Sequence, residues 1–328
     1  MIQIVVPAQQ GGGVYDFAFK LQSALGQEGV RLVHLSKATI SDWQFGPEDV
    51  VFLQLSGYGF EKRGAPLWLL GAIEKRRKHI KTFGVFFHEL FAFGPPWTSA
   101  FWLSPVQRYI ARRLAELSDF WMTSREGSAQ WLKRFAADKP HAVLPVFSTI
   151  GEPADYAQTR LPRVIVFGSP GLRQLTYQAA GDKLFTWAKQ AALEIHDIGA
   201  PVADQQLLAT LRSNGVALHG HLPDREIRHA MASAMFGLLA YPVEYVAKSS
   251  VFAAYAAHGL CPVLISQGYG KSDGLVCGHH YLPNVPTQMV SFVQAAAVGA
   301  AACEWYQPHQ LRNHAEAVRG FLRDREGF

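Results

Sequence analysis

Short apolar runs alternate with helical patterns along the whole chain. In the first half, runs typical of buried strands lie near residues 2–6, 31–34, 50–54, 82–87, 120–123 and 141–145. Helical patterns separate them near residues 14–27, 66–75, 105–117 and 126–135. Because strands that alternate with helices usually pair in parallel, this order predicts an α/β fold with doubly wound parallel sheets.

The alternation breaks once, at residues 148–162, where a glycine, two prolines and polar residues indicate a linker. A second series then begins, with strands predicted near residues 163–168, 194–198, 216–219, 236–240 and 262–265. Its helices are predicted near residues 183–192, 204–213, 223–235, 251–258, 291–302 and 307–322. Since 328 residues fit two domains, we predict Rossmann-like domains at 1–150 and 151–328, with the last helix a candidate to cross back.

The net charge of +5 comes mostly from the first 160 residues. Its densest part is residues 74–81, and Arg108, Arg112 and Arg113 follow on a predicted helix. One interpretation is a solvated helix end, because basic residues suit a helix C-terminus. The other is contact with a lipid phosphate or a membrane surface. The second interpretation predicts a protein bound peripherally at the inner membrane face through its N-terminal domain; we expect no nucleic-acid partner.

No apolar run approaches the roughly 20 residues that a membrane helix needs, and the chain begins with a strand pattern rather than a signal peptide. We therefore expect a cytoplasmic protein. The three cysteines show no metal-like pairing, and adjacent His279 and His280 point in different directions on most backbones. No metal site is predicted.

Residues 241–250 form a polar loop between an apolar strand and a helix of small residues. Lys248 brings a full charge to the predicted helix start, where N–H groups favour an anion. Ser249 and Ser250 can cap that helix or donate to phosphate oxygens, and Glu244 can accept from ribose hydroxyls. With Tyr241, which opens the loop, they predict a site for a nucleotide diphosphate. Solvated loop residues and a plain serine cap are the alternative.

Glycines at positions 11–13 follow the first predicted strand and open the first helix. Glycine permits close approach of a ligand, and a helix start favours an anion. The spacing differs from the dinucleotide fingerprint, and a tight turn is an equal alternative. We take Gly12 and Gly13 as donor-binding candidates, Tyr15 as an acceptor-side candidate and Asp16 as a candidate base.

A histidine and a glutamate, His88 and Glu89, stand directly after the strongly apolar strand 82–87. An aromatic and proline-rich loop follows them, and function commonly gathers on such loops. Phe93 and Trp97 of this loop can stack on a carbohydrate acceptor or simply pack the loop down. For His88, a ring satisfied by backbone partners is the alternative.

The order of motifs in residues 219–262 resembles the C-terminal domain of GT-B glycosyltransferases, in particular the retaining group 1 (glycogen-synthase-like) family. The resemblance implies two Rossmann-like domains that face each other across a cleft. It also implies that His88 contacts the transferred sugar and that Glu89 orients the sugar or the acceptor. Gly168 and Arg173, after the first strand of the second domain, would then hold the diphosphate, a role that suits the forked donors of arginine.

The chain departs from this family at its paired glutamates, which stand eight positions apart. Glu244 matches the first glutamate, but the second position holds Phe252, or Ala254 if the alignment starts from Gly259. The usual second donor contact therefore has no counterpart here.

These features predict a glycosyltransferase of the hexosyltransferase type that moves a sugar from a nucleotide diphosphate sugar to a hydroxyl acceptor. The acceptor is a glycan, a lipid-linked molecule or a small molecule. The transfer is expected to retain the configuration at the anomeric carbon of the sugar. Donor binding needs no metal if basic side chains hold the diphosphate. An inverting transfer would need a base, for which His88, Glu89 and Asp16 are the candidates. A nucleotide-sugar epimerase and a non-catalytic binding module are the alternatives.

Overall fold

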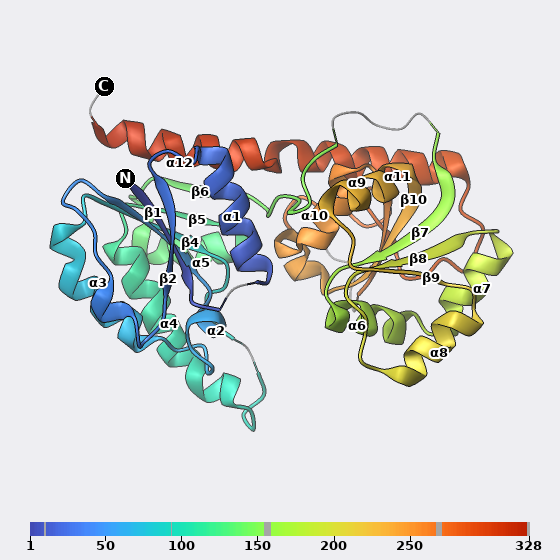
Figure 1. Ribbon diagram of the computed structural model, residues 1–328, viewed down its shortest axis with the longest axis horizontal. Coiled ribbons are helices and arrows are strands. Elements are labelled where there is room, and N and C mark those ends of the chain that lie inside the picture. The colour runs from blue at the N-terminus through green and yellow to red at the C-terminus, as the bar shows by residue number, and fades with distance from the viewer. Residues whose placement is uncertain (10, 93, 154–158, 267–270, 327–328) are drawn as a thin grey trace. The chain divides into compact units, whose positions relative to one another are not determined.

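A computed structural model describes residues 1–9, 11–92, 94–153, 159–266 and 271–326. The chain divides into unit 1, Met1–Pro145 with Leu311–Phe328, and unit 2, Val146–Gln310. Each unit holds a six-stranded parallel sheet with helices packed around it (Figure 1). The predicted α/β class with parallel sheets is confirmed.

The sheet of unit 1 has the order β2-β1-β3-β4-β5-β6. Its strands are β1 (Ile2–Pro7), β2 (Val30–Leu35), β3 (Val50–Leu55), β4 (Thr82–Phe87), β5 (Phe120–Thr123) and β6 (His141–Val143). The helices are α1 (Gly13–Leu25), α2 (Gly57–Phe60), α3 (Leu67–Arg76), α4 (Ser99–Leu117), α5 (Glu126–Ala136) and α12 (Leu311–Glu326), with 3-10 turns η1 (Ile40–Asp42) and η2 (Arg77–His79).

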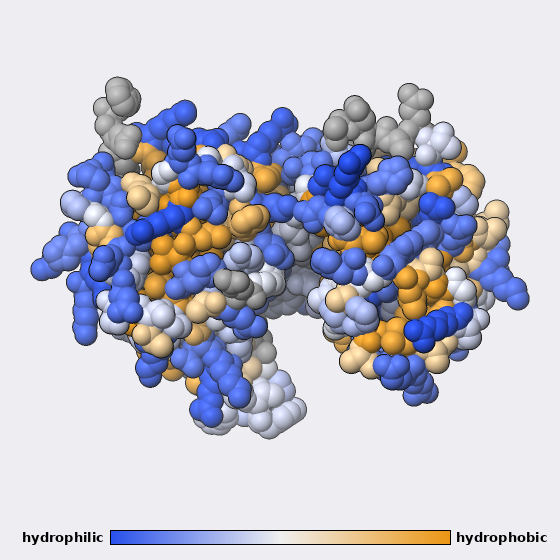
Figure 2. Space-filling view, in the orientation of Figure 1, coloured by the Kyte–Doolittle hydropathy of each residue, from blue (hydrophilic) through white to orange (hydrophobic). Residues whose placement is uncertain are grey.

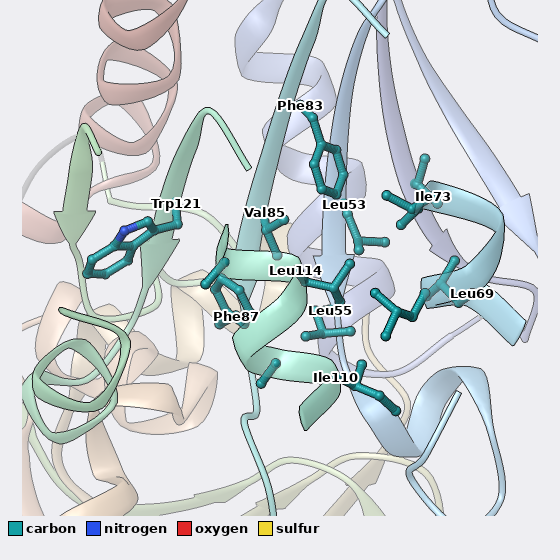
Figure 3. Packing of buried hydrophobic residues seen from close by; sticks show 14 of the residues in the cluster. Leu53, Leu55, Leu69, Ile73, Phe83, Val85, Phe87, Ile110, Leu114 and Trp121 are labelled. Carbon is teal, nitrogen blue, oxygen red and sulfur yellow. The ribbon is translucent and has the colours of Figure 1, made fainter. Parts of the chain in front are cut away.

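One face of this sheet carries the larger core. Leu53 and Leu55 of β3 and Phe83, Val85 and Phe87 of β4 point to the same side, as the two-residue repeat of a strand requires (Figure 3). They pack against α3 and α4 through Leu69, Ile73, Ile110 and Leu114. The apolar pattern of the sequence therefore positions the carboxyl ends of β3 and β4 rigidly.

The opposite face is covered by α1 and α12. Phe120 stacks on Phe321 of α12 with ring centroids 4.9 Å apart, and Arg319 donates to the Ala24 carbonyl at 2.7 Å. Gly84 lies beneath the Phe120 ring, where a Cβ atom would stand 2.1 Å from a ring carbon. The last helix is therefore part of the core of unit 1, although 165 residues of unit 2 separate it from the rest of that unit.

The sheet of unit 2 has the order β12-β11-β10-β7-β8-β9. Its strands are β7 (Leu161–Phe167), β8 (Glu194–Ile198), β9 (Ala217–Gly220), β10 (Ala234–Ala240), β11 (Cys261–Ile265) and β12 (Leu282–Pro283). The helices are α6 (Pro170–Ala180), α7 (Asp182–Gln190), α8 (Gln205–Ser213), α9 (Asp224–Ser233), α10 (Ser250–Ala257) and α11 (Phe292–Tyr306), with 3-10 turns η3 (Val243–Lys248) and η4 (Gln307–His309).

A buried histidine of unit 2 predicts how stability depends on pH. His258 ends α10, is fully buried and lies with Nδ1 2.8 Å from the Ala254 carbonyl oxygen. Burial lowers its pKa from 6.5 to about 4. In this pH range the His258 side chain binds a proton in the unfolded chain but not in the folded chain. The free energy of unfolding therefore falls as the pH drops from 6.5 to about 4. The loss attributable to His258 is on the order of 3 kcal/mol, at about 1.36 kcal/mol for each pKa unit.

Urea unfolding at pH 7.5 and pH 4.5 measures this loss. His258→Gln is expected to reduce the difference between the two pH values, and His79→Gln, at an exposed position, is expected to leave it unchanged. Some difference remains in His258→Gln because burial also lowers the pKa of His309 to about 4. An unaltered pH difference in His258→Gln would contradict the assignment.

Candidate functional site

The strand orders locate one candidate region in each unit. In open parallel sheets, ligands bind at the carboxyl ends of the strands, where the strand order reverses. In unit 1 that point lies between β1 and β3, and in unit 2 between β7 and β10. The predicted site residues can therefore be compared with these two positions.

In unit 2, three loops meet at the carboxyl edge of the sheet. Gly168, after β7, has φ 128°, and a Cβ atom there would stand 3.1 Å from a methyl carbon of Val251 in α10. A Cβ atom at Gly199, after β8, would stand 2.4 Å from the Gly168 carbonyl oxygen. Both positions need glycine because the loops are packed this closely. The structure thus brings Gly168 next to the start of α10, as the predicted donor site requires.

The loop after β10 supplies the polar groups of this region. Ser249 is 5% exposed, and its hydroxyl accepts from the Phe252 N–H at 3.2 Å, so this serine takes the helix-capping role. Lys248 is half-buried with Nζ 5.6 Å from the centroid of the Tyr245 ring. Ser250 is the first residue of α10. The cation of Lys248 therefore directly precedes the start of α10, which Ser249 caps.

The other residues of this loop lie around that pair. Glu244 is exposed in the first turn of η3, one turn before Lys248. Tyr241 is half-buried, and its N–H donates to the Ile265 carbonyl at 3.1 Å. Phe252, at the position of the family's second glutamate, is buried 5.7 Å from the Trp305 ring.

Arg173 requires a correction, because the structure gives it a different role from the predicted one. Its side chain is 1% exposed and donates to the Gly168 carbonyl at 3.0 Å, to the Ala200 carbonyl and to the Asp197 carboxylate. Asp197 also accepts from the Tyr177 hydroxyl at 3.0 Å, and burial, with Asp197 second, raises the pKa of Tyr177. The guanidinium therefore connects the loops after β7 and β8 through buried hydrogen bonds, and it is not placed to bind a diphosphate.

In unit 1, the glycine loop leaves the start of α1 open. Gly11 and Gly12 have φ 91° and 92°, and among the residues that the structure describes no side chain caps the helix. A Cβ atom at Gly12 or Gly13 would meet nothing within 4 Å. Asp16 is exposed in the first turn of the same helix. The backbone of this loop is therefore accessible, as the prediction of a binding loop requires.

His88 stands at the carboxyl end of β4, beside the switch point. Its Nε2 atom lies 3.0 Å from Oε1 of Gln54, which is fully buried in β3. Because an amide oxygen only accepts, this contact is a hydrogen bond when His88 carries a proton on Nε2. The ring is flanked by Phe86 at 4.4 Å and by Phe17 of α1 at 5.0 Å, so its orientation is fixed from three sides.

Two groups that support His88 were not predicted from the sequence. Gln54 interrupts a buried apolar strand, and this interruption is the signal that could have identified it. His314, from α12, stacks on Phe86 at 6.2 Å and lies with Nε2 2.9 Å from the Pro145 carbonyl oxygen. The last helix was predicted as a candidate to cross back, but no local pattern places His314 beside Phe86.

The remaining predicted residues of unit 1 are more scattered. Glu89 is half-buried beside His88 in the sequence, and Trp97 is 85% exposed. Tyr15 packs 5.8 Å from His34, on a different side of α1 from Phe17. Phe93 lies outside the described residues.

The described residues contain neither a group of metal ligands nor a helix that could span a membrane. In that part of the chain, no three histidine, cysteine, aspartate or glutamate side chains are grouped so that they could hold a metal ion. None of the helices described there combines the length and the apolar character needed to cross a membrane.

Comparison with known proteins identifies the fold. The sequence matches no protein-family model and no curated protein. Among solved structures, the chain resembles the pneumococcal O-GlcNAc transferase GtfA in complex with UDP and GlcNAc, with 13% identity and a TM-score of 0.57 over 89% of this chain. The chain spans about 60% of the length of GtfA.

Two other solved structures match over nearly the whole of both chains. An α-glucosyltransferase in complex with UDP-glucose and DNA containing an abasic site has 9% identity and a TM-score of 0.56, covering 99% of this chain and 98% of that chain. AviGT4, a glycosyltransferase involved in avilamycin A biosynthesis, has 12% identity and a TM-score of 0.51, covering 100% and 98%. These similarities confirm the predicted GT-B fold.

Proposed function

We propose that this protein is a glycosyltransferase that moves a sugar from a nucleotide diphosphate sugar to a hydroxyl acceptor. One observation carries the proposal: a GT-B fold with a cation and a capped helix start at the switch point of unit 2. The nucleotides named for its structural neighbours support a donor of this class, because GtfA is described with UDP and the α-glucosyltransferase with UDP-glucose.

In unit 2, Lys248 and the N–H groups at the start of α10 stabilise the charge that grows on the leaving diphosphate. Gly168 lets the backbone come close to the same phosphates. Glu244 accepts from the ribose hydroxyls. In this proposal the diphosphate is held by protein groups without a metal, and the second glutamate of the family is replaced by the buried ring of Phe252.

In unit 1, His88 contacts the transferred sugar. The ring is held in one orientation by Gln54, Phe86 and Phe17, which suits a fixed contact with a sugar hydroxyl. Glu89 orients the sugar or the acceptor. Asp16, in the first turn of α1, is the carboxylate next to the open glycine loop. We propose retention and a hexose donor, as in the group 1 family, so no protein nucleophile is assigned.

The proposed acceptor is a hydroxyl of a glycan, a lipid-linked molecule or a small molecule in the cytoplasm, with Tyr15 and Trp97 on the acceptor side. Nucleic acid is not proposed as a partner, because most of the charges in the densest basic run of unit 1, residues 74–81, are paired within the unit. Arg77 pairs with Asp119 at 2.6 Å and Lys81 pairs with Glu48 at 2.6 Å.

The donor site predicts a selective loss of nucleotide binding when Lys248 is removed. Among UDP, GDP, ADP and dTDP, one nucleotide is expected to raise the thermal midpoint, with and without EDTA, because it binds only the folded state. Lys248→Ala is expected to weaken that nucleotide more than about tenfold, since a hydrogen bond to a charged group contributes about 1.5–3 kcal/mol.

The matched control is Lys183→Ala, because Lys183 is an exposed lysine in α7 of the same unit. Equal losses of affinity in the two variants would remove Lys248 from the site. If no nucleotide shifts the midpoint of the unaltered protein, the proposal of a nucleotide-sugar donor fails.

A further inference from the structure

The outward side of α4 is aromatic where a solvated helix would carry polar residues. Phe101, Trp102, Arg108, Tyr109 and Arg112 recur at helical spacing on this side, and Trp97 stands in the loop before it. We name these six residues the α4 face. The start of α4 projects from the lower edge of unit 1 in Figure 1.

The aromatic rings of the α4 face are exposed to an unusual extent. The exposed fraction is 85% for Trp97, 70% for Trp102, 51% for Tyr109 and 43% for Phe101. The Trp102 indole donates to the Pro96 carbonyl at 2.8 Å and meets the Phe101 ring edge to face at 5.3 Å. These rings are therefore held in place at the surface, and their exposure is not explained by packing within unit 1.

Near the centre of the α4 face, the charged side chains are all basic. From Leu90 to Ala115 the chain contains no aspartate or glutamate, but it contains three arginines. Arg108 lies over the Phe91 ring at 4.4 Å, and Arg112 lies over the Phe135 ring at 5.0 Å and pairs with Glu116 at the far end of the helix. The first three turns of α4 thus hold one arginine, Arg108, among exposed aromatic rings, because Arg112 and Arg113 follow in the fourth turn and pair with Glu116.

The basic run at residues 74–81 offers a weaker surface than its sequence suggests. Arg77 donates to Asp119, Lys81 pairs with Glu48, and Arg76 donates to two backbone carbonyls. Most of its charges are therefore used within unit 1. If this protein meets an anionic surface, the α4 face and not residues 74–81 supplies the combination of charge and exposed rings.

We propose that the α4 face docks unit 1 onto the surface of an anionic phospholipid bilayer. Tryptophan and tyrosine rings settle at the level of the lipid headgroups, and arginines near an anionic leaflet are attracted to its phosphates. The surface lacks large aliphatic side chains, and Figure 2 shows this tip mostly in the pale and blue colours of intermediate and hydrophilic residues. Tryptophan and phenylalanine rings beside basic residues are the composition of helices that lie in the bilayer interface.

Docking there would face the reaction site toward the bilayer. The α4 face begins at the carboxyl end of β4, the same edge of the sheet that carries His88. The bilayer contact itself does not depend on the proposed transferase activity, and it can be tested by binding alone.

Sedimentation with lipid vesicles tests the proposal. The full chain is expected to sediment with vesicles that contain phosphatidylglycerol and to remain in solution with pure phosphatidylcholine. Trp97→Ser with Trp102→Ser is expected to weaken binding more than about tenfold, from the loss of two large apolar side chains. Arg108→Gln is expected to weaken it about fivefold, the equivalent of about 1 kcal/mol for one basic residue near the surface, and 0.5 M salt is expected to weaken it further.

Two control variants separate this surface from others. Met289→Ser with Val293→Ser removes two exposed apolar side chains of unit 2, which are 83% and 81% exposed, and Lys75→Gln with Lys78→Gln removes charges of the predicted basic run. Both controls are expected to bind vesicles like the unaltered protein. The proposal is overturned if the unaltered protein ignores anionic vesicles, if a control loses as much as the tryptophan variant, or if that variant instead turns a dimer into a monomer in light scattering.

Discussion

Replacing Arg173 with methionine is expected to lower the free energy of unfolding of unit 2 by about 3–5 kcal/mol, the usual effect of removing one partner of a buried ion pair. Asp197 is 4% exposed and would lose its guanidinium partner. The Gly168 and Ala200 carbonyls would lose their donor at the same time. The expected loss is large because three groups, the Asp197 carboxylate and two carbonyls, depend on one side chain.

Urea unfolding followed by circular dichroism measures this change. Arg163→Met is the matched control, because Arg163 pairs with Glu194 at the surface, where such a pair contributes about 1 kcal/mol or less. Arg173→Met with Asp197→Leu is expected to recover part of the lost stability, since it removes the uncompensated charge. The structural role of Arg173 is refuted if Arg173→Met is as stable as Arg163→Met and loses only nucleotide affinity.

Every predicted strand lies within two residues of the observed bounds, whereas β12, α2 and α6 were not predicted. β4, β5 and β8 have the predicted bounds because each is a continuous apolar or alternating run between polar breaks. α6 was not predicted, since Pro170 and Gly171 are typical of a turn, yet proline is well suited to the first position of a helix and Ser169 caps it. α4 begins at Ser99 and contains Pro105, which was predicted to open it.

The positions of the candidate site residues could be predicted better than their roles. Gly168 and His88 follow strands directly and Lys248 lies in the loop after β10, so the topology decides where they lie. Arg173 also follows a strand, but its role depends on Asp197, a partner 24 residues away that no local pattern reveals. The same holds for His314, whose place beside Phe86 depends on the path of the entire chain.

Replacing His88 with alanine is expected to reduce kcat about 10²–10³-fold if the proposed transfer takes place, which is the usual effect of removing one preorganised polar group from a reacting centre. The nucleotide itself is expected to bind as before, because Lys248, Ser249 and Ser250 lie in unit 2. A transfer or donor-hydrolysis assay with the nucleotide sugar selected by the thermal screen measures kcat, and a titration with the free nucleotide measures affinity. His79→Ala, at an exposed position, is the control.

A second variant separates the chemistry of His88 from its packing. Gln54→Leu keeps the ring between Phe17 and Phe86 but removes the amide that lies 3.0 Å from its Nε2 atom. Because the ring then loses the polar partner that orients it, kcat is expected to fall about tenfold, the share that one neutral hydrogen bond of about 1.4 kcal/mol can supply. If His88 serves only to pack unit 1, His88→Ala will lose stability in urea and Gln54→Leu will keep full turnover, and the catalytic role must then pass to Glu89 or Asp16.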